Sequence, residues 1–462
     1  MNNTIGNIFR FTIWGASHAP AVGVTIEGIP EGTGIDMDRL QIFLNRRRPG
    51  QDALSTARKE PDRIEFTGGV TLTGHAAVVS DSSVTAMIRN TDTRPEDYDD
   101  LRFVPRPGHA DFAAMARFGE ERESAGGGQF SGRMTAPLCI AGGIAVQILE
   151  RYGVRISAVP LRIGGETDPG QMRAAIENAA EEGDSVGGIV ECVIEGLPAG
   201  IGEPMFDGIE NRIAQMVFGI PAVKGIEFGA GFAAADLKGS ENNDAFEAVS
   251  QANEQSMTFR VRTRTNHHGG ALGGLSSGMP VVFRAAFKPT PSIAKEQDSV
   301  DIRTGEPVRL KIRGRHDPCI VLRAVPVVEA AAAAAVYDLL LAYEAEKSSR
   351  HALSRDVMEE LREEIDAADE EIIRAFEKRM DAAAKIGKYK KEHSLPILDA
   401  AREREKLAAI GSRVRTELWP YYGELYAGIF GLSKKYQHEM TRDRAEGEAE
   451  TADGDGTDGS RQ

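Results

Sequence analysis

The chain has 462 residues, more than the roughly 250–300 residues at which one hydrophobic core stops growing, so we expect at least two domains. Hydrophobic residues make up 41% and charged residues 27%, a globular composition that excludes disorder over the main body of the chain. The net charge of −15 disfavours nucleic acid as a partner, because that partner requires a clustered basic surface.

Cysteine usage and the N-terminal sequence indicate a reduced, cytoplasmic compartment. The three cysteines are too widely spaced for a disulfide framework or a zinc motif, and we expect them to be core thiols: Cys139, Cys192 and Cys319. The N-terminus, MNNTIGNIFRFTIWG, lacks the basic start and apolar run of a secretory signal. The most apolar stretch, 325–343, contains Glu329 and Asp338, which predicts a buried helix rather than a membrane span.

Residues 1–347 have the pattern of a mixed α and β domain. Short β-type runs such as GVTIEGI, GGIVECVIEG and GMPVVFRAAF alternate with helical segments such as QMRAAIENAAEE. Glycine is frequent throughout. We therefore predict an α+β domain over this range.

Residues 348–441 change in character, because glycine becomes rare and charged helix formers dominate after EKSSRH. Ser354 is a good N-cap for a first helix that runs to about His393, with apolar residues stepping by three or four positions. Pro396 and Pro420 restart the chain into a second and a third helix. The sequence thus predicts an all-α domain, followed by an acidic disordered tail over 442–462.

Several compact motifs in the first domain combine histidine, arginine and glycine. They are WGASHAPAVG (14–23), RRRPG (46–50), TARKEPD (56–62), RPGHAD (106–111), GGGQFSGRMT (126–135), KPTPS (288–292) and GRHDP (314–318). Histidines can act as acids or bases near neutral pH, arginines can bind a doubly charged phosphate, and glycines let backbone amides approach it. Together the motifs suit a site that releases phosphate from an anionic substrate.

Each of these motifs alone is a weak signal. A single loop histidine is usually a bystander, RRR is usually a solvated face, and GGG is usually a flexible turn. No glycine fingerprint lies between a strand and a helix with an acidic residue about 20 positions further on, so a dinucleotide fold is not indicated.

In order and spacing, the motifs resemble chorismate synthase over nearly all of residues 1–345. Further matching segments are GDSVGGIVE, PAGIGEPMFD, PAVKGIEFGAGF, GSENND, NHHGGALGGLSSG and CIVLRAVPVVEA. The resemblance implies a β-α-β sandwich, usually tetrameric. It also implies that reduced FMN assists a 1,4-elimination of phosphate from 5-enolpyruvylshikimate 3-phosphate, which gives chorismate.

The resemblance assigns roles to residues of this chain. His18 would protonate the departing phosphate, His109 would manage the proton of the reduced flavin, and Asp317 would take a proton through the flavin. The phosphate and carboxylates would meet Arg47, Arg106 and Arg133. Flavin contacts would fall on Ser131, Ala222, Gly273, Lys288, Thr290, Ser292 and Arg315. The reaction is redox-neutral overall, so the flavin must arrive reduced, from an external and NADPH-dependent reductase.

The chain departs from the family pattern in three places. The usual GESHG is GASHA, the usual GGRSSARET is GGQFSGRMT, and an arginine expected just after RRRPG is Ala53. Gln129 and Phe130 thus replace an arginine and a serine beside the flavin phosphate. We expect these changes to affect flavin affinity more than the fold.

Polar residues in the helical domain are grouped by face. Asp399, Arg402 and Glu403 lie at i, i+3 and i+4, and Ser433 and Gln437 lie at i and i+4. Any one such set is usually a solvated helix face with ion pairs.

Together with Arg362, Arg379 and Lys390, these residues resemble the active-site set of the all-helical chorismate mutases, most strongly in LREEIDAADEEIIRAFEKRMDAAAKIGKYK. The resemblance implies an intertwined dimer and a Claisen rearrangement of chorismate to prephenate without a cofactor. Arg362, Arg379 and Arg402 would clamp the carboxylates, and Lys390 and Gln437 would donate to the ether oxygen. Glu403 would be protonated or act through the substrate hydroxyl, and Asp399 and Ser433 would complete the polar wall.

Two alternatives remain open at this point. In one alternative, the first domain is a synthase-like scaffold that has decayed to a binding or regulatory role, so that only the mutase is active. In the other alternative, the helical domain is an oligomerisation coiled coil. The retained histidines argue against the first alternative, and the filled polar set on three helices argues against the second.

Overall fold

The computed structural model describes residues 3–50, 60–92, 102–119, 125–253, 256–312, 317–411 and 413–441. The chain divides into two compact units, Met1–Ser348 and Ser349–Gln462. One long helix, α7 (Val321–Glu392), contributes residues to both units. The expected tail over 442–462 lies outside the described residues.

The first unit contains a five-stranded antiparallel sheet. Its strand order is β1 (Thr4–Ile5), β2 (Arg10–Gly15), β3 (Ala21–Glu27), β8 (Ser83–Arg89) and β5 (Glu65–Gly68). Val84, Ala86 and Ile88 alternate with less buried residues along β8, which is the period-two pattern of a sheet with one face on the core. A three-stranded sheet of β4 (Gly34–Asp36), β7 (Ala76–Val79) and β6 (Val70–Thr73) belongs to the same half.

A second antiparallel sheet has four strands. Its order is β11 (Val223–Phe228), β16 (Val281–Phe287), β10 (Gly188–Glu195) and β9 (Arg155–Ile163). Val281, Phe283, Ala285 and Phe287 are buried at every second position of β16. The strands predicted from GVTIEGI, GGIVECVIEG and GMPVVFRAAF are confirmed as β3, β10 and β16.

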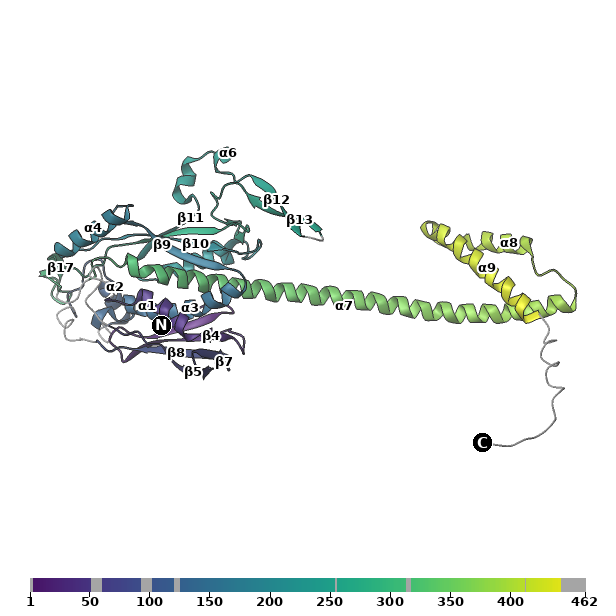
Figure 1. Cartoon of the computed structure of the whole chain (residues 1–462), viewed down its shortest axis with the longest axis horizontal. Coiled ribbons are helices and arrows are strands. Elements are labelled where there is room, and N and C mark those ends of the chain that lie inside the picture. Colours follow the sequence, from purple (N-terminus) through teal and green to yellow (C-terminus); the bar gives the residue numbers. More distant parts are fainter. Residues whose placement is uncertain are drawn as a thin grey trace, which may run out of the picture. The chain divides into compact units, whose positions relative to one another are not determined.

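Helices fill the space between the two sheets: α1 (Met37–Arg47), α3 (Thr135–Arg151) and the first part of α7 (Figure 1). Small residues let α3 and α7 approach closely. A Cβ added at Gly142 of α3 would lie 2.3 Å from the Cα atom of Ala330 on α7. The three cysteines are buried in this unit, as expected of core thiols, and burial raises the pKa of Cys139 to about 12.

The remaining elements of the first unit lie around this sandwich. The helices are α2 (Asp111–Phe118), α4 (Pro169–Glu181), α5 (Ile209–Phe218) and α6 (Gly239–Asn242). The hairpins are β12 (Phe246–Asn253) with β13 (Ser256–Thr263), β14 (Ala271–Leu272) with β15 (Leu275–Ser276), and β17 (Gln297–Val300) with β18 (Pro307–Leu310).

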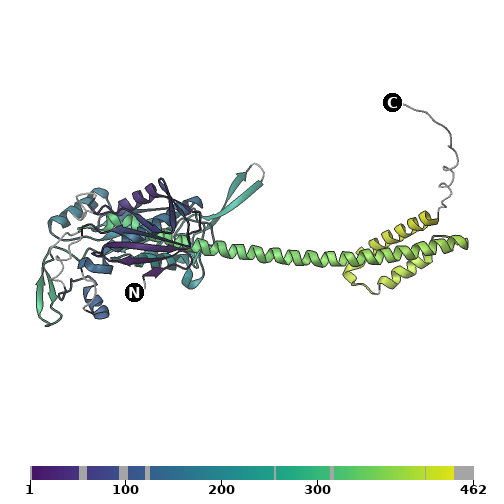
Figure 2. The ribbon, with the colours of Figure 1, turned by 90° about the horizontal axis from the view of Figure 1, so that it is seen from below.

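In the second unit, α8 (Ala400–Gly411) and α9 (Trp419–Thr441) lie beside the C-terminal part of α7 (Figure 2). The three predicted helices are confirmed, but the predicted start at Ser354 is wrong, because α7 continues through it. No glycine or proline occurs between Val327 and Ile386, so no residue there breaks the helix.

Two helices in the described residues are long and apolar enough to cross a membrane, at Gly132–Arg151 and Val321–Ser349. Their most apolar windows are 89% and 94% buried inside the protein. They are therefore core helices, and the interpretation of 325–343 as a buried helix is confirmed.

Candidate functional site

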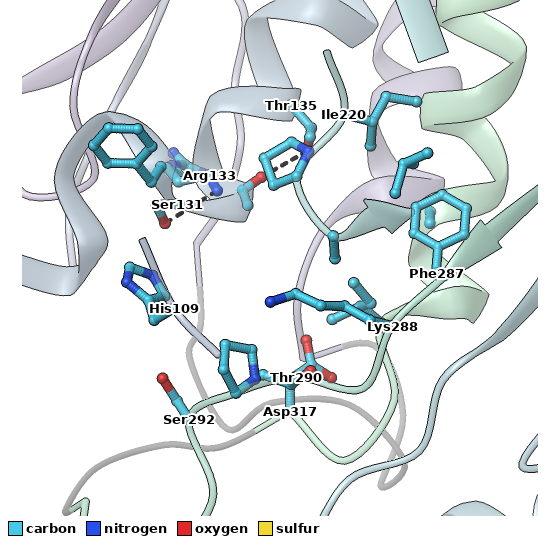
Figure 3. Close-up of a pocket in the computed structure, with 18 of the residues that line it drawn as sticks. His109, Ser131, Arg133, Thr135, Ile220, Phe287, Lys288, Thr290, Ser292 and Asp317 are labelled. Carbon is cyan, nitrogen blue, oxygen red and sulfur yellow. Dashed lines mark hydrogen bonds between the residues drawn. The ribbon is translucent and has the colours of Figure 1, made fainter. Parts of the chain in front are cut away.

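A cavity of about 540 Å³ opens in the first unit, lined by residues from six of the seven motifs (Figure 3). The structure brings eleven sequence-predicted site residues to its wall: His18, Arg47, Arg106, His109, Ser131, Arg133, Ala222, Lys288, Thr290, Ser292 and Asp317. Two others are not among them. Gly273 lies in the β14–β15 turn, away from this wall, and Arg315 lies outside the described residues, as does Ala53.

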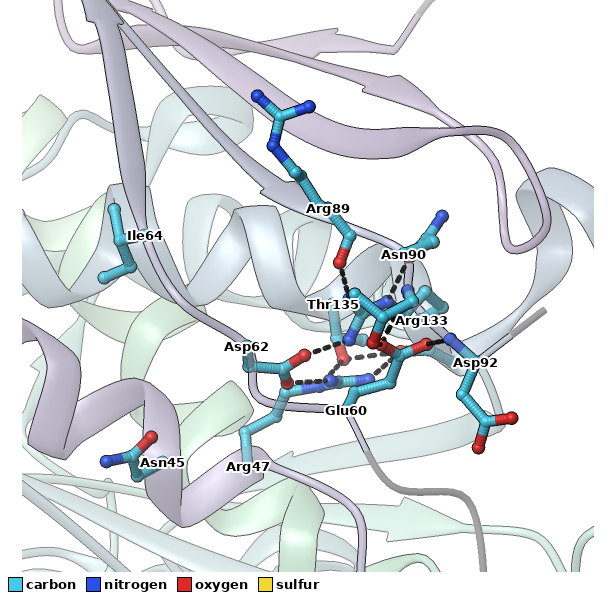
Figure 4. Close-up of polar contacts among 12 residues, drawn as sticks. Asn45, Arg47, Glu60, Asp62, Ile64, Arg89, Asn90, Asp92, Arg133 and Thr135 are labelled. Atoms are coloured by element: carbon cyan, nitrogen blue, oxygen red, sulfur yellow. Dashed lines mark hydrogen bonds and ion pairs between the residues drawn. The ribbon is translucent and has the colours of Figure 1, made fainter.

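One buried carboxylate holds two of the predicted substrate-binding arginines (Figure 4). Asp62 Oδ2 lies 3.0 Å from Arg47 Nη1, and Asp62 Oδ1 pairs with Arg133 Nη1. Arg47 also donates to Thr135 Oγ1 and to the carbonyl of Gly132, both at 3.0 Å. Burial lowers the pKa of Arg47 to about 10, while the charge of Asp62 opposes that shift.

A second carboxylate holds Arg106 and His109. Arg106 donates to Asp111 through Nε at 2.7 Å and through Nη2 at 2.9 Å, and His109 Nδ1 lies 2.6 Å from Asp111 Oδ1. Burial opposes ionisation of Asp111, but the hydrogen bonds from Arg106 and His109 hold its pKa well below the usual range. Arg106 Nη1 also donates to Ser292 Oγ at 3.0 Å, which connects this group to the KPTPS motif.

The KPTPS motif supplies further polar groups to the cavity, which Figure 3 shows facing the same space as His109. Thr290 Oγ1 is buried and has no hydrogen-bond partner among the described residues. Burial lowers the pKa of Lys288, whose ammonium donates to the carbonyl of Gly108. Ala222 accepts from the Lys288 amide at 3.0 Å and has a φ of 74°, a left-handed conformation that alanine rarely adopts.

The cavity suits a phosphate-bearing, largely planar group as well as an anionic substrate. Its wall offers the guanidinium groups of the predicted arginines, the unpaired Thr290 hydroxyl and the apolar faces of Ile220 and Phe287. Binding sites of this kind combine apolar walls with a few convergent polar groups. The residues present therefore fit FMN.

The structure adds residues that sequence reasoning did not single out. Asp62 and Asp111 stand at the ends of the TARKEPD and RPGHAD motifs, and Arg323 Nη2 lies 2.5 Å from Asp317 Oδ2 at the cavity wall. The sequence signal that could have indicated these aspartates is charge balance. Arginines that are expected to be buried require acidic counter-ions nearby.

In the second unit, polar residues of three helices meet beside Ser433 on α9. Arg379 Nη1 of α7 donates to Ser433 Oγ at 2.9 Å, and the guanidinium lies 5.6 Å from the centre of the Phe430 ring. Gln437, one turn further along α9, packs against Gly387. The next residue after Ser433, Lys434, brings its ammonium to 3.1 Å from Glu403 Oε1 of α8.

Other predicted mutase residues are placed differently. Lys390 donates to the carbonyl of Ile397 at 2.8 Å, and Asp399 accepts from the amide of Arg402 at 3.0 Å near the start of α8. The Arg402 side chain is exposed and pairs with Glu405 at 2.6 Å. Arg362 is exposed on α7, 17 positions before Arg379. In the single chain, the side chains of Arg362 and Arg402 are therefore both exposed.

Comparison with known proteins identifies both units. The family model for chorismate synthase matches residues 9–341, and the model for chorismate mutase type II matches residues 361–438. The chorismate synthase of Korarchaeum cryptofilum is 41% identical over 360 residues, which cover 73% of this chain and 96% of that protein. The chorismate synthase of Chitinophaga pinensis is 45% identical over 339 residues, again 73% of this chain and 96% of that protein.

A solved structure shares the fold of the first unit. A crystal structure of chorismate synthase superposes with a TM-score of 0.54 and covers 73% of this chain and 93% of that one, at 22% sequence identity. At this identity the likeness concerns the fold alone.

Proposed function

The chain belongs to the chorismate synthase family over residues 9–341 and carries a chorismate mutase type II domain over 361–438, and from this premise we propose which residues perform the two reactions. The synthase eliminates phosphate from 5-enolpyruvylshikimate 3-phosphate to give chorismate, and the mutase rearranges chorismate to prephenate. The two activities are successive because the product of the first is the substrate of the second.

In the synthase, we propose that Arg47, Arg106 and Arg133 bind the phosphate and carboxylates of the substrate. Guanidinium groups suit this task because they bind such anions through two parallel hydrogen bonds. The observation that carries the proposal is that these arginines and both predicted proton-transfer histidines line one cavity. His18 then delivers a proton to the departing phosphate.

His109 is the second proton-transfer residue in this proposal. Nδ1 lies 2.6 Å from a carboxylate oxygen of Asp111, which favours a proton on Nδ1 and leaves Nε2 as the proposed proton-transfer nitrogen. Asp317, beside Arg323, would take a proton through the flavin.

The synthase family uses reduced FMN, and we propose that Ser131, Ala222, Lys288, Thr290 and Ser292 hold it. When bound, reduced FMN supplies an electron-rich ring that assists the loss of phosphate. The overall reaction consumes no electrons, so we propose that a separate, NADPH-dependent reductase delivers the flavin already reduced. The cytoplasm is the proposed compartment.

We propose that the synthase units assemble into a homo-oligomer, a tetramer by resemblance to the family. The hairpin β12–β13 pairs only with itself among the described strands, and an isolated two-stranded ribbon is marginally stable. Large apolar side chains are exposed in one chain, on the hairpin at Phe246 and Val261 and elsewhere in the first unit at Met205, Phe206 and Phe232. Gly273, which lies outside the cavity wall of its own chain, would then serve the flavin site of a neighbouring copy.

We propose that the mutase units also pair, as an intertwined dimer. Val357, Leu361, Ile365 and Ile372 step along one face of α7 and are each about half exposed or more in the single chain. A second copy that covers this face brings its own Arg362 towards Arg379, so that both can bind the chorismate carboxylates. Lys390 and Gln437 donate to the ether oxygen, while Arg402, Asp399, Glu403 and Ser433 complete the wall.

One assay tests the assignment of two separate sites. The full chain is incubated with 5-enolpyruvylshikimate 3-phosphate and reduced FMN, and phosphate, chorismate and prephenate are measured. His109→Ala should abolish phosphate release but keep turnover of added chorismate, and Arg379→Ala should do the reverse. If either substitution abolished both activities in folded protein, the two-site assignment would be wrong.

A further inference from the structure

The side chain of Asp62 is held in place by two arginines of the cavity wall. Its side chain is fully buried between Arg47 and Arg133, which are themselves 2% and 3% exposed and line the cavity. Each carboxylate oxygen takes a different guanidinium, so the spacing of the two arginines is set by the width of one carboxylate.

The backbone at Asp62 is held as firmly as the side chain. Its φ is 44°, a left-handed conformation that a non-glycine residue keeps only where the surrounding structure enforces it. Gln41 of α1 enforces it from both directions, because its Nε2 donates to the Asp62 carbonyl at 2.9 Å and its Oε1 accepts from the Ile64 amide at 3.2 Å. Since α1 also carries Arg47, one helix fixes both partners of the ion pair.

The charges in this group do not cancel. Two guanidiniums and one carboxylate give these three side chains a net charge of +1, and without the carboxylate the two guanidiniums would repel each other. A carboxylate beside an anion-binding site weakens binding of the anion, so anion affinity does not explain its presence there. Asp62 compensates the two buried guanidiniums and also preorganises them, because donors already aimed at the place where charge develops need no reorganisation during the reaction.

We infer that Asp62 is a positioning residue of the synthase, which fixes the spacing of Arg47 and Arg133 and favours turnover at the expense of anion affinity. This inference rests on the proposed role of both arginines in binding the substrate. It predicts opposite effects on binding and on rate when the carboxylate is neutralised.

Asp62→Asn is the decisive variant, because asparagine tolerates the left-handed backbone and keeps the shape of the side chain while removing its charge. In the full chain we expect kcat of phosphate release to fall roughly 10²-fold, the cost of a small misplacement of binding groups. The dissociation constant of inorganic phosphate, measured by calorimetry without turnover, should fall several-fold, because the site gains positive charge. A purely structural role would not tighten phosphate binding.

Asp62→Glu keeps the charge but displaces it by one methylene group, and it keeps the test decisive if the asparagine variant does not fold. For this variant we expect a lowered kcat with phosphate affinity near that of the unmodified chain. Glu27→Gln, in the exposed pair of Arg10 and Glu27 at 2.5 Å, is the matched control and should leave both quantities unchanged.

An unaltered kcat in either folded Asp62 variant, or weaker phosphate binding in Asp62→Asn, would overturn the inference. Failure of the proposed synthase function gives a different result from failure of this inference. If the synthase function is wrong, the unmodified chain releases no phosphate from 5-enolpyruvylshikimate 3-phosphate, whereas the phosphate titration still reports on the arginines.

Discussion

His109 Nδ1 lies 2.6 Å from Asp111 Oδ1, and the same carboxylate accepts two hydrogen bonds from the Arg106 guanidinium and one from its backbone amide. This contact orients the imidazole and favours the tautomer with its proton on Nδ1. The proposed proton transfer would then use Nε2, which lies 3.3 Å from Arg106 Nη2, a choice that the sequence motif RPGHAD does not reveal.

Asp111→Asn should lower kcat of the synthase roughly 10²- to 10⁴-fold, the usual contribution of a positioned acid or base. Asparagine keeps the size of the side chain but can present its amide to Nδ1 and favour the other tautomer. The matched control is Asp38→Asn, in the exposed pair of His75 and Asp38 at 2.8 Å, which should leave phosphate release unchanged. Equal rates for the Asp111 variant and the unmodified chain would contradict the role of Asp111.

The depressed pKa of Asp111 also predicts how stability depends on pH. A carboxyl whose pKa is lower in the folded than in the unfolded state stabilises the fold above its unfolded value, about 3.9, and loses that contribution as the pH falls through the folded value. At pH 7 we expect Asp111→Asn to lower the free energy of unfolding by about 1.5–3 kcal/mol. Thermal unfolding from pH 7 to pH 2 should show the difference shrinking below about pH 4. A constant difference over this range would assign the effect to packing.

Gln129 lies in the 3₁₀ helix Ala125–Phe130 at the cavity wall, where the resemblance to the family leads us to expect an arginine. Gln129→Arg should tighten FMN binding by about 1.5–3 kcal/mol, because a hydrogen bond to a charged group is gained. Fluorescence titration with FMN measures this directly. Gln171→Arg, on the exposed surface of α4, adds the same charge away from the cavity and should have no effect. An unchanged titration for Gln129→Arg would mean that the flavin phosphate is held elsewhere.

Arg362 and Arg379 are 17 positions apart on α7, a rise of about 25 Å at 1.5 Å per residue, too far to converge on one chorismate. Each of Arg362→Ala and Arg379→Ala should therefore be inactive as a mutase, and co-expression should restore activity. In a mixed pair one site collects both lesions and the other none, so random pairing returns about a quarter of normal turnover. No recovery in proven mixed pairs would place Arg362 outside the site.

The close contact of α3 and α7 predicts opposite outcomes for two Gly→Ala substitutions. Gly142→Ala places a Cβ 2.3 Å from the Ala330 backbone and should destabilise the first unit by about 1–3 kcal/mol. Gly428→Ala, inside α9 with nothing within 4 Å of the added atom, should stabilise the second unit by about 0.4–1 kcal/mol. Thermal unfolding of each variant measures both shifts. Destabilisation by Gly428→Ala would indicate a contact that the single chain does not show.

The sequence by itself determined the two units, their α+β and all-α classes, and the strands and helices with clear periodicity. Alternating apolar residues in GMPVVFRAAF and the proline at 420 are local signals, and β16 and α9 follow them. The order and spacing of the motifs also indicated the family, by resemblance, while their residue types suit phosphate release and proton transfer.

Only the tertiary structure decided which carboxylates hold the site together. Asp62 lies 15 positions from Arg47 and 71 from Arg133, and no local pattern links them, because a buried ion pair is selected by spatial fit. The continuation of α7 past Ser354 was also visible only in the structure, because capping is a weak local preference and no glycine or proline interrupts the helix there. Within one chain, Gly273 lies away from the cavity wall where it was expected to contact the flavin, and Arg362 lies 17 positions from Arg379 on the same helix. Spacing along the sequence does not encode such distances across a fold or between copies.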